Sequence, residues 1–155
     1  MDDASQQTPS GAVELSIPSS PKSLAIVRGA VERMARLEGF SESEVGGIVL
    51  AIDEALANVI KHAYRGACDR PIKIRLEAVT GCDGQAGLQV TVRDFGLQVD
   101  PASIHGRDLH DVRPGGLGVH IIRTIMDETE YSCPIDGGMQ LRMVKYLPAS
   151  GSSGR

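Results

Sequence analysis

The sequence predicts a single two-layer α/β domain, in which a mixed, mostly antiparallel sheet carries three main helices on one face. Two observations lead to this prediction. The chain has 155 residues, 41% of them hydrophobic, which suits one globular domain. Segments that alternate apolar and polar residues, as half-exposed strands do, are interspersed with longer segments of helical periodicity. The domain is expected over residues 11–147, with mobile tails at 1–10 and 148–155 that are poor in apolar residues.

The first strand and the first helix follow each other closely. Residues 12–17 alternate apolar and polar side chains and predict a strand. Ser20 and Pro21 then form a typical helix start, as N-cap and first helical residue, and Gly39 stands where a terminating glycine is expected. The apolar stripe that should face the core consists of Leu24, Val27, Val31, Met34 and Ala35.

A second helix is expected to begin at once and to run to about Tyr64. Its start is marked by Ser41 and Glu44, which have the spacing of a capping box. Its apolar face consists of Val45, Ile48, Val49, Ile52, Leu56, Val59 and Ile60.

The next segments predict a pair of antiparallel strands. Apolar residues alternate with charged ones over 72–77, and the alternation returns over 88–92, beyond a glycine-rich turn at 81–87. This pattern indicates that one face of the sheet is exposed to water.

The last third of the chain begins with a long aperiodic segment. Residues 94–115 are rich in Pro, Gly, His and Asp, and loops of this length are usually functional or disordered. A third helix is expected to begin near Gly116, and strands at about 129–133 and 138–147 should complete the sheet.

Composition excludes several classes of function. The net charge of −4 argues against a protein that binds nucleic acid through a basic surface, and five scattered aromatic residues without Trp cannot form a base-stacking platform. The three cysteines form no C-x-x-C pair, which favours a reducing compartment, and we expect a cytoplasmic protein. No apolar run is long enough to span a membrane.

A polar stripe on the second helix is the first candidate site. Glu54, Asn58 and His62 recur every four residues and should lie on one side of the helix. A solvated polar face would explain them equally well. However, Asn is a poor residue for a helix interior, and a carboxylate one turn from a carboxamide offers oxygen ligands for Mg²⁺ or a base beside a metal ligand.

A D-x-G turn is the second candidate. Asp94 and Gly96 directly follow an expected strand, and both residue types favour turns for backbone reasons alone. An Asp at the end of a strand can also accept a hydrogen bond from the exocyclic amine of adenine. The D-F-G of eukaryotic-type protein kinases is not implied, because no other motif of that fold is present.

The third candidate is the glycine-rich sequence P-G-G-L-G at 114–118, which opens the third helix. A flexible loop is the simpler interpretation. Glycines beside the unpaired amides of a helix start can also form an anion site, although this sequence is neither a P-loop nor a Rossmann fingerprint.

Taken in order, these three motifs resemble the ATPase fold that gyrase, histidine kinases and MutL share, the Bergerat-type ATP-binding fold. Within that superfamily the chain is similar to the anti-sigma-factor serine/threonine kinases of bacterial partner-switching systems, most clearly at D-E-A-L-A-N-V-I-K-H-A-Y (53–64) and G-G-L-G-V-H-I-I-R-T-I-M-D-E (115–128). The similarity extends over residues 12–147.

The resemblance implies a role for each motif. Glu54 matches the general base, Asn58 the Mg²⁺ ligand and Asp94 the acceptor for adenine. ATP would bind between the second helix and a lid formed by 94–115. The positions that would surround the nucleotide are Asn58, His62, Asp94, Gly96, Arg113, Gly115, Gly116, Leu117 and Gly118. Two positions depart from the family: Met139 replaces a Thr that helps to bind adenine, and Pro114 follows Arg113, which shifts that arginine relative to a γ-phosphate ligand.

The implied function is phosphorylation of a Ser or Thr on a small anti-sigma-factor antagonist, with a sigma factor or comparable regulator as the second partner that is held inactive. A homodimer is left open. Two other interpretations also stay open: a switch that binds ATP and a regulator without catalysis, and an interaction domain that has lost nucleotide binding, for which Met139 is the only sign.

Overall fold

The computed structural model describes residues 11–104 and 116–149. The strands are β1 (Val13–Pro18), β2 (Pro71–Thr80), β3 (Ala86–Arg93), β4 (Glu128–Ser132) and β5 (Gln140–Tyr146). The helical segments are α1 (Pro21–Glu38), α2 (Glu42–Asn58), the π-helical η1 (Val59–Ala63), the 3₁₀-helical η2 (Pro101–Ser103) and α3 (Leu117–Ile125).

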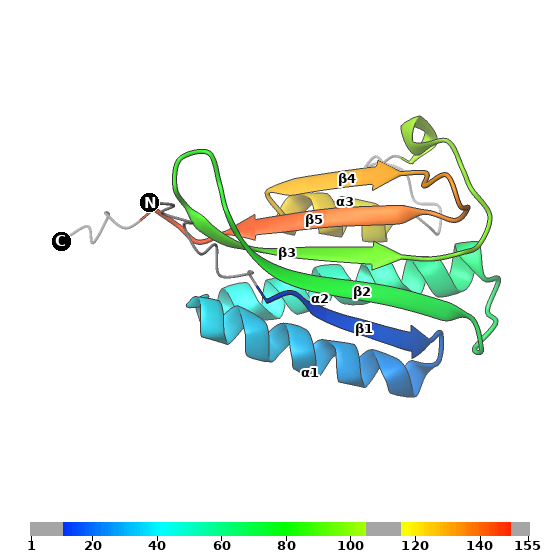
Figure 1. Ribbon diagram of the computed structural model, residues 1–155, viewed down its shortest axis with the longest axis horizontal. Coiled ribbons are helices and arrows are strands. Elements are labelled where there is room, and N and C mark those ends of the chain that lie inside the picture. Colours follow the sequence, from blue (N-terminus) through cyan, green and yellow to red (C-terminus); the bar gives the residue numbers. More distant parts are fainter. Residues whose placement is uncertain (1–10, 105–115, 150–155) are drawn as a thin grey trace, which may run out of the picture.

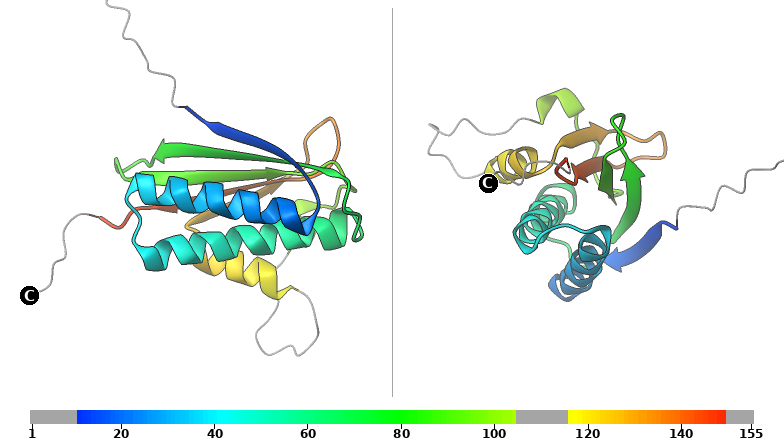
Figure 2. Two further views of the ribbon diagram at one scale, coloured as in Figure 1. Left: turned by 90° about the horizontal axis from the view of Figure 1, so that it is seen from below. Right: turned by 90° about the vertical axis from the view of Figure 1, so that its left-hand side faces the viewer.

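The five strands form one sheet in the order β1-β2-β3-β5-β4, and every pairing between them is antiparallel. The helices α1, α2 and α3 lie on one face of this sheet, behind it in Figure 1 and below it in the left view of Figure 2. The expected two-layer α/β fold is confirmed, and the strands 72–77 and 88–92 pair as expected.

The helix α1 begins and ends at the residues that the sequence predicts. Pro21 is the first helical residue after the N-cap Ser20, and Gly39 ends the helix in the left-handed conformation at φ 97°. A side chain is strained at this φ, whereas glycine adopts it freely, so the chain can turn directly into α2. The capping box of α2 is also formed, since the Ser41 amide donates to Glu44 Oε2 at 2.7 Å and the Glu44 amide donates to Ser41 Oγ at 3.3 Å.

The second helix differs from the expectation in its last turn. It was expected to run as one α-helix to about Tyr64, but α2 ends at Asn58 and the π turn η1 continues it to Ala63. Here the Tyr64 amide donates to the carbonyl of Val59, five residues back, at 3.0 Å. Single π turns inside helices are frequently found at functional sites.

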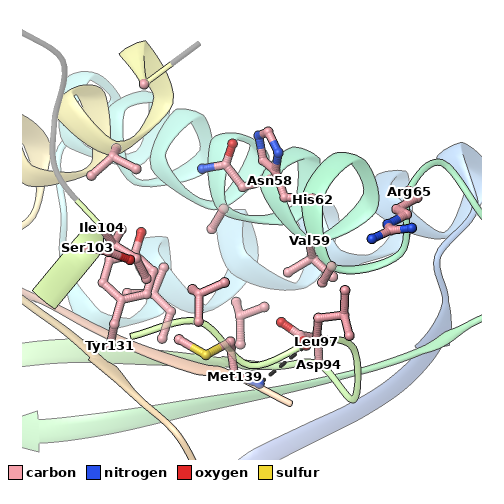
Figure 3. A pocket seen from close by; sticks show the side chains of 17 residues that line it. Asn58, Val59, His62, Arg65, Asp94, Leu97, Ser103, Ile104, Tyr131 and Met139 are labelled. Carbon is pink, nitrogen blue, oxygen red and sulfur yellow. Dashed lines mark hydrogen bonds between the residues drawn. The ribbon is translucent and has the colours of Figure 1, made fainter. Parts of the chain in front are cut away.

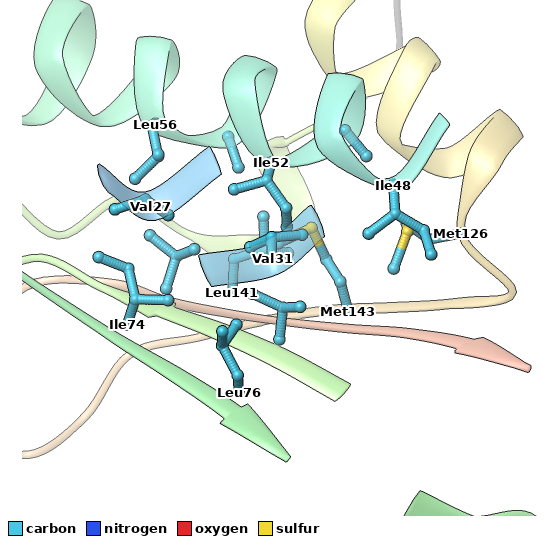
Figure 4. Close-up of a cluster of buried hydrophobic side chains, with 14 of the residues drawn as sticks. Val27, Val31, Ile48, Ile52, Leu56, Ile74, Leu76, Met126, Leu141 and Met143 are labelled. Carbon is cyan, nitrogen blue, oxygen red and sulfur yellow. The ribbon is translucent and has the colours of Figure 1, made fainter. Parts of the chain in front are cut away.

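The core lies between the helical layer and the sheet, where the expected apolar faces of α1 and α2 meet strands β2, β3 and β5 (Figure 4). Its completely buried members include Val27 and Val31 of α1 and Ile48, Ile52 and Leu56 of α2. The polar side of α2, which carries Glu54 and Asn58, faces the start of α3.

The segment after β3 contains one element that was not expected. Asp100 caps the 3₁₀ turn η2 by accepting from the Ala102 amide at 2.9 Å, and Pro101 is its first residue. The pair Asp-Pro is itself a start signal of this kind. Most of the expected lid, 105–115, lies outside the described residues, as do the expected tails apart from Pro148 and Ala149. Among the described helices none is long and apolar enough to cross a membrane.

Candidate nucleotide site

A cavity of about 480 Å³ opens between the end of α2, the π turn η1 and the ends of β3 and β5. Most ligand pockets of proteins have volumes in this range and mainly apolar walls. Figure 3 shows Asn58 and His62 on the helical side and Asp94 and Met139 on the sheet side. The apolar lining residues are Ala55, Val59, Ala63, Val92, Leu97, Val99, Ile104, Val119, Tyr131, Met139 and Leu141.

The polar stripe of the second helix faces the cavity in part. Asn58 and His62 line it, whereas Glu54 lies one turn earlier, beside the start of α3. A solvated face, the simpler interpretation of this stripe, does not describe Asn58, because that side chain lies between the cavity and α3.

Gly118 allows α3 to approach the stripe closely. A Cβ atom at Gly118 would lie 2.7 Å from Glu54 Oε2, 3.4 Å from Asn58 Nδ2 and 3.5 Å from Asn58 Oδ1, so the carboxylate and the amide both lie beside the start of α3. Carboxylate and amide oxygens are suitable ligands for Mg²⁺, which usually takes one or two protein ligands and completes its shell with water and substrate phosphates. The residues present therefore fit this ion.

Asp94 is almost completely buried, at 4% exposure, on the opposite side of the cavity. Its Oδ1 accepts from the Gly96 amide at 2.9 Å and from the Met139 amide at 3.3 Å. Its Oδ2 has no hydrogen-bond partner in the described part of the chain. Burial raises the pKa of Asp94 above the usual value, and the two amides and the charge of Arg93 oppose that rise. A fixed carboxylate with one free oxygen suits an amine donor such as that of adenine.

Gly96 does not line the cavity, although a nucleotide contact was implied for it. A Cβ atom at Gly96 would lie 2.6 Å from the carbonyl oxygen of Ala63, so the turn after β3 packs directly on the end of η1. The glycine is thus required for contact between protein segments.

Gly138 is a site residue that the sequence analysis missed. It has φ 70°, and a Cβ atom there would lie 2.0 Å from the carbonyl oxygen of Asp94. No substitution could keep the backbones of these two residues in their present contact. The glycine pair 137–138 before an apolar strand was the available signal, because it marks a close backbone approach.

Met139 lines the sheet side of the cavity at the position where the resemblance implies Thr. Its backbone remains part of the site, because its amide donates to Asp94 and its carbonyl accepts from the Asp94 amide at 3.0 Å. Its sulfur lies 3.4 Å from the Cys133 sulfur. The Met139 side chain therefore makes this wall apolar, where the resemblance implies the hydroxyl of a Thr.

The start of α3 forms the remaining wall. Gly116 lines the cavity and is the N-cap of α3 in the left-handed conformation at φ 78°. The first amides of the helix have no partner within it, so this end of the cavity suits a phosphate. Leu117 is half exposed and does not line the cavity. Arg113 and Gly115, also implied to contact nucleotide, lie outside the described residues.

Comparison of the sequence with curated proteins supports the expected relationship. The chain is 28% identical over 144 residues to the serine-protein kinase RsbW of Listeria innocua, and the match covers 87% of each chain. It is also 28% identical over 140 residues to the protein of the same name from Halalkalibacterium halodurans, covering 87% of this chain and 83% of that one.

Two solved structures have a similar fold. The RsbU and RsbW domains of Rv1364c from Mycobacterium tuberculosis match with a TM-score of 0.60 at 18% identity, over 94% of this chain and 35% of that longer one. The SiaB-SiaC complex from Pseudomonas aeruginosa contains a chain that matches with a TM-score of 0.51 at 15% identity, over 87% of this chain and 89% of that one. The model of the histidine kinase-like ATPase domain matches residues 17–145, and the chain belongs to this family.

Proposed function

We propose that the protein is an ATP-dependent serine/threonine protein kinase that phosphorylates a small anti-sigma-factor antagonist and sequesters a sigma factor or a comparable regulator. The family is one of ATPase domains, and the curated relatives are named serine-protein kinases. The observation that carries the proposal is the arrangement around one cavity: Asp94 on the sheet side, Asn58 on the helical side, and Glu54 beside the start of α3.

This arrangement would favour one orientation of a bound nucleotide. The adenine amine would donate to the free oxygen of Asp94, with the ring between the apolar side chains of η1 and the sheet. The phosphates would then extend along the polar stripe toward the first amides of α3. His62 lines the cavity between these two ends and is assigned to nucleotide binding without a narrower role.

In the proposed reaction the hydroxyl oxygen of a Ser or Thr bonds to the γ-phosphorus of ATP, and the bond from that phosphorus to the bridging oxygen of ADP breaks. The hydroxyl proton passes to the Glu54 carboxylate, and ADP and the phosphoprotein leave. Such transfer depends mainly on positioning and on neutralisation of charge. Mg²⁺, held by Asn58 with Glu54 close by, would neutralise charge on the phosphates.

The proposal is tested by incubating the protein with γ-labelled ATP, Mg²⁺ and a candidate antagonist encoded near its own gene. Acid-stable label on a Ser or Thr of the antagonist, lost in the variant E54Q, is the expected result. If ATP binds but no antagonist is labelled, the protein is the non-catalytic switch. If no adenine nucleotide binds, the proposed function is wrong, and the chain is an interaction domain.

A further inference from the structure

We propose that Tyr64 is a positioning residue for adenine recognition, because its hydroxyl holds the backbone turn that aims the carboxylate of Asp94 into the cavity. The inference rests on the adenine role of Asp94 proposed above. Tyr64 itself does not line the cavity, so it would act on the nucleotide only through Asp94.

Tyr64 joins three segments: the end of η1, the start of β2 and the turn after β3. Its ring is buried, at 9% exposure, behind the end of η1. Its hydroxyl donates to the carbonyl of Pro71, at the start of β2, and accepts from the amide of Phe95 at 2.8 Å. The direction of both bonds is fixed, because a carbonyl can only accept and an amide can only donate. Burial raises the pKa of Tyr64, so the phenol keeps its proton at neutral pH.

The Phe95 amide is the middle one of three consecutive amides that define the turn. The Asp94 amide donates to the Met139 carbonyl, and the Gly96 amide donates to Asp94 itself. Among the described residues, the Phe95 amide is the one of the three whose acceptor is a side chain from outside the turn. Loss of the Tyr64 hydroxyl would leave this amide without its acceptor next to the carboxylate that reads the base.

The side chain of Phe95 cannot replace this anchor. It is 39% exposed and lies outside the cavity, with the Arg93 guanidinium 4.9 Å and the Lys73 ammonium 5.7 Å from its ring centre. The turn is thus held from the inside by Tyr64 and by the close contact of Gly96 with Ala63. Both contacts come from the end of η1, so the π turn links the Mg²⁺ end of the site to the adenine end.

The test measures the affinities of ADP and inosine diphosphate (IDP) for the full chain by calorimetry. IDP lacks the exocyclic amine, so the ratio of the two affinities reports on the contact with Asp94. In the variant Y64F the ring stays and only the hydroxyl is lost. We expect ADP affinity to fall by about three- to tenfold, the range of one neutral hydrogen bond, with IDP affinity unchanged within twofold.

The matched control is Y146F. Tyr146 does not line the cavity, and its hydroxyl donates to the Glu128 carboxylate at 2.7 Å. This variant also loses a bonded tyrosine hydroxyl, but away from the cavity, and it should keep the wild-type ratio. A purely structural role of Tyr64 would lower stability, measured by thermal unfolding, without changing the ratio in the folded protein.

The outcomes separate this inference from the proposed function. A wild-type protein that binds no ADP overturns the proposed function. A wild-type protein that prefers ADP, with the same preference in Y64F, overturns the inference alone. If Y64F does not fold, hydrogen exchange of the wild type decides: the Phe95 amide should exchange as slowly as the Asp94 amide, and rapid exchange at Phe95 would refute the anchor.

Discussion

Replacing Gly118 with Ala should separate catalysis from folding in this protein. Gly118 is the second residue of α3, and a Cβ atom there would lie 2.7 Å from Glu54 Oε2 and 3.4 Å from Asn58 Nδ2. The closest atom is the end of a flexible side chain, so Glu54 can withdraw without disturbing the backbone. Alanine also favours the helix by up to about 1 kcal/mol relative to glycine. The free energy of unfolding should therefore change by less than about 1 kcal/mol.

Catalysis should respond much more strongly. To restore an ordinary contact of about 3.4 Å with the new methyl group, the Glu54 carboxylate has to retreat by roughly 0.7 Å. Displacement of a reacting group by about 1 Å can cost about 10²-fold in rate. We therefore expect phosphotransfer in G118A to be slower by about 10- to 100-fold, although both Glu54 and Asn58 are still present.

The assay is a single-turnover transfer of label from ATP to the antagonist, with thermal unfolding measured on the same samples. The matched control is G46A, because Gly46 lies in α2 and a Cβ atom there would meet nothing within 4 Å. This variant gains the same helical preference without touching the site and should keep the wild-type rate. A wild-type rate in G118A would show that the close approach of α3 does not set the position of Glu54.

Three further predictions concern the individual site residues. E54Q keeps the shape of the side chain but removes the proton acceptor, so the rate of phosphotransfer should fall by about 10²- to 10⁴-fold. The ADP affinity measured by calorimetry should stay within twofold of the wild type. A wild-type rate would reject Glu54 as the base. N58A should weaken ATP binding in Mg²⁺ but not in EDTA, and an equal loss in both would reject the metal role. Because burial raises the pKa of Asp94, its accepting, ionised form is lost at a higher pH than for an exposed Asp. The ratio of ADP to IDP affinity should thus fall as pH drops through that raised pKa, whereas it should be low and independent of pH in D94N.

The fold could be predicted because its signals are local. Ser20 with Pro21 and the capping box at Ser41 fix where two helices begin, and alternation of apolar residues fixes which faces of the strands are buried. The π turn after Asn58 could not be predicted in this way. Its residues have ordinary helical periodicity, whereas the Tyr64 hydroxyl at its end bonds to Pro71 and to Phe95, and these contacts exist only in the folded chain.

Two side chains that the sequence singled out line the same cavity. Asn58 and Asp94 stood out because an amide inside a helix and a carboxylate after a strand both require an explanation, and the structure places both at one cavity. The apolar walls were not predictable as part of a site. Leu97, Val99 and Tyr131 come from segments without a distinguishing pattern and meet only in the folded chain.

The glycines of the site also have a packing role that the sequence motifs did not indicate. The sequence assigned Gly96 and Gly118 to contact with nucleotide, but the atoms nearest to their missing Cβ positions belong to Ala63 and Glu54. Gly138, which was assigned nothing, has the tightest contact of the three, with the backbone of Asp94. These glycines therefore let the strand turn, the helix end and α3 meet more closely than side chains at the same positions would allow without a shift of their neighbours.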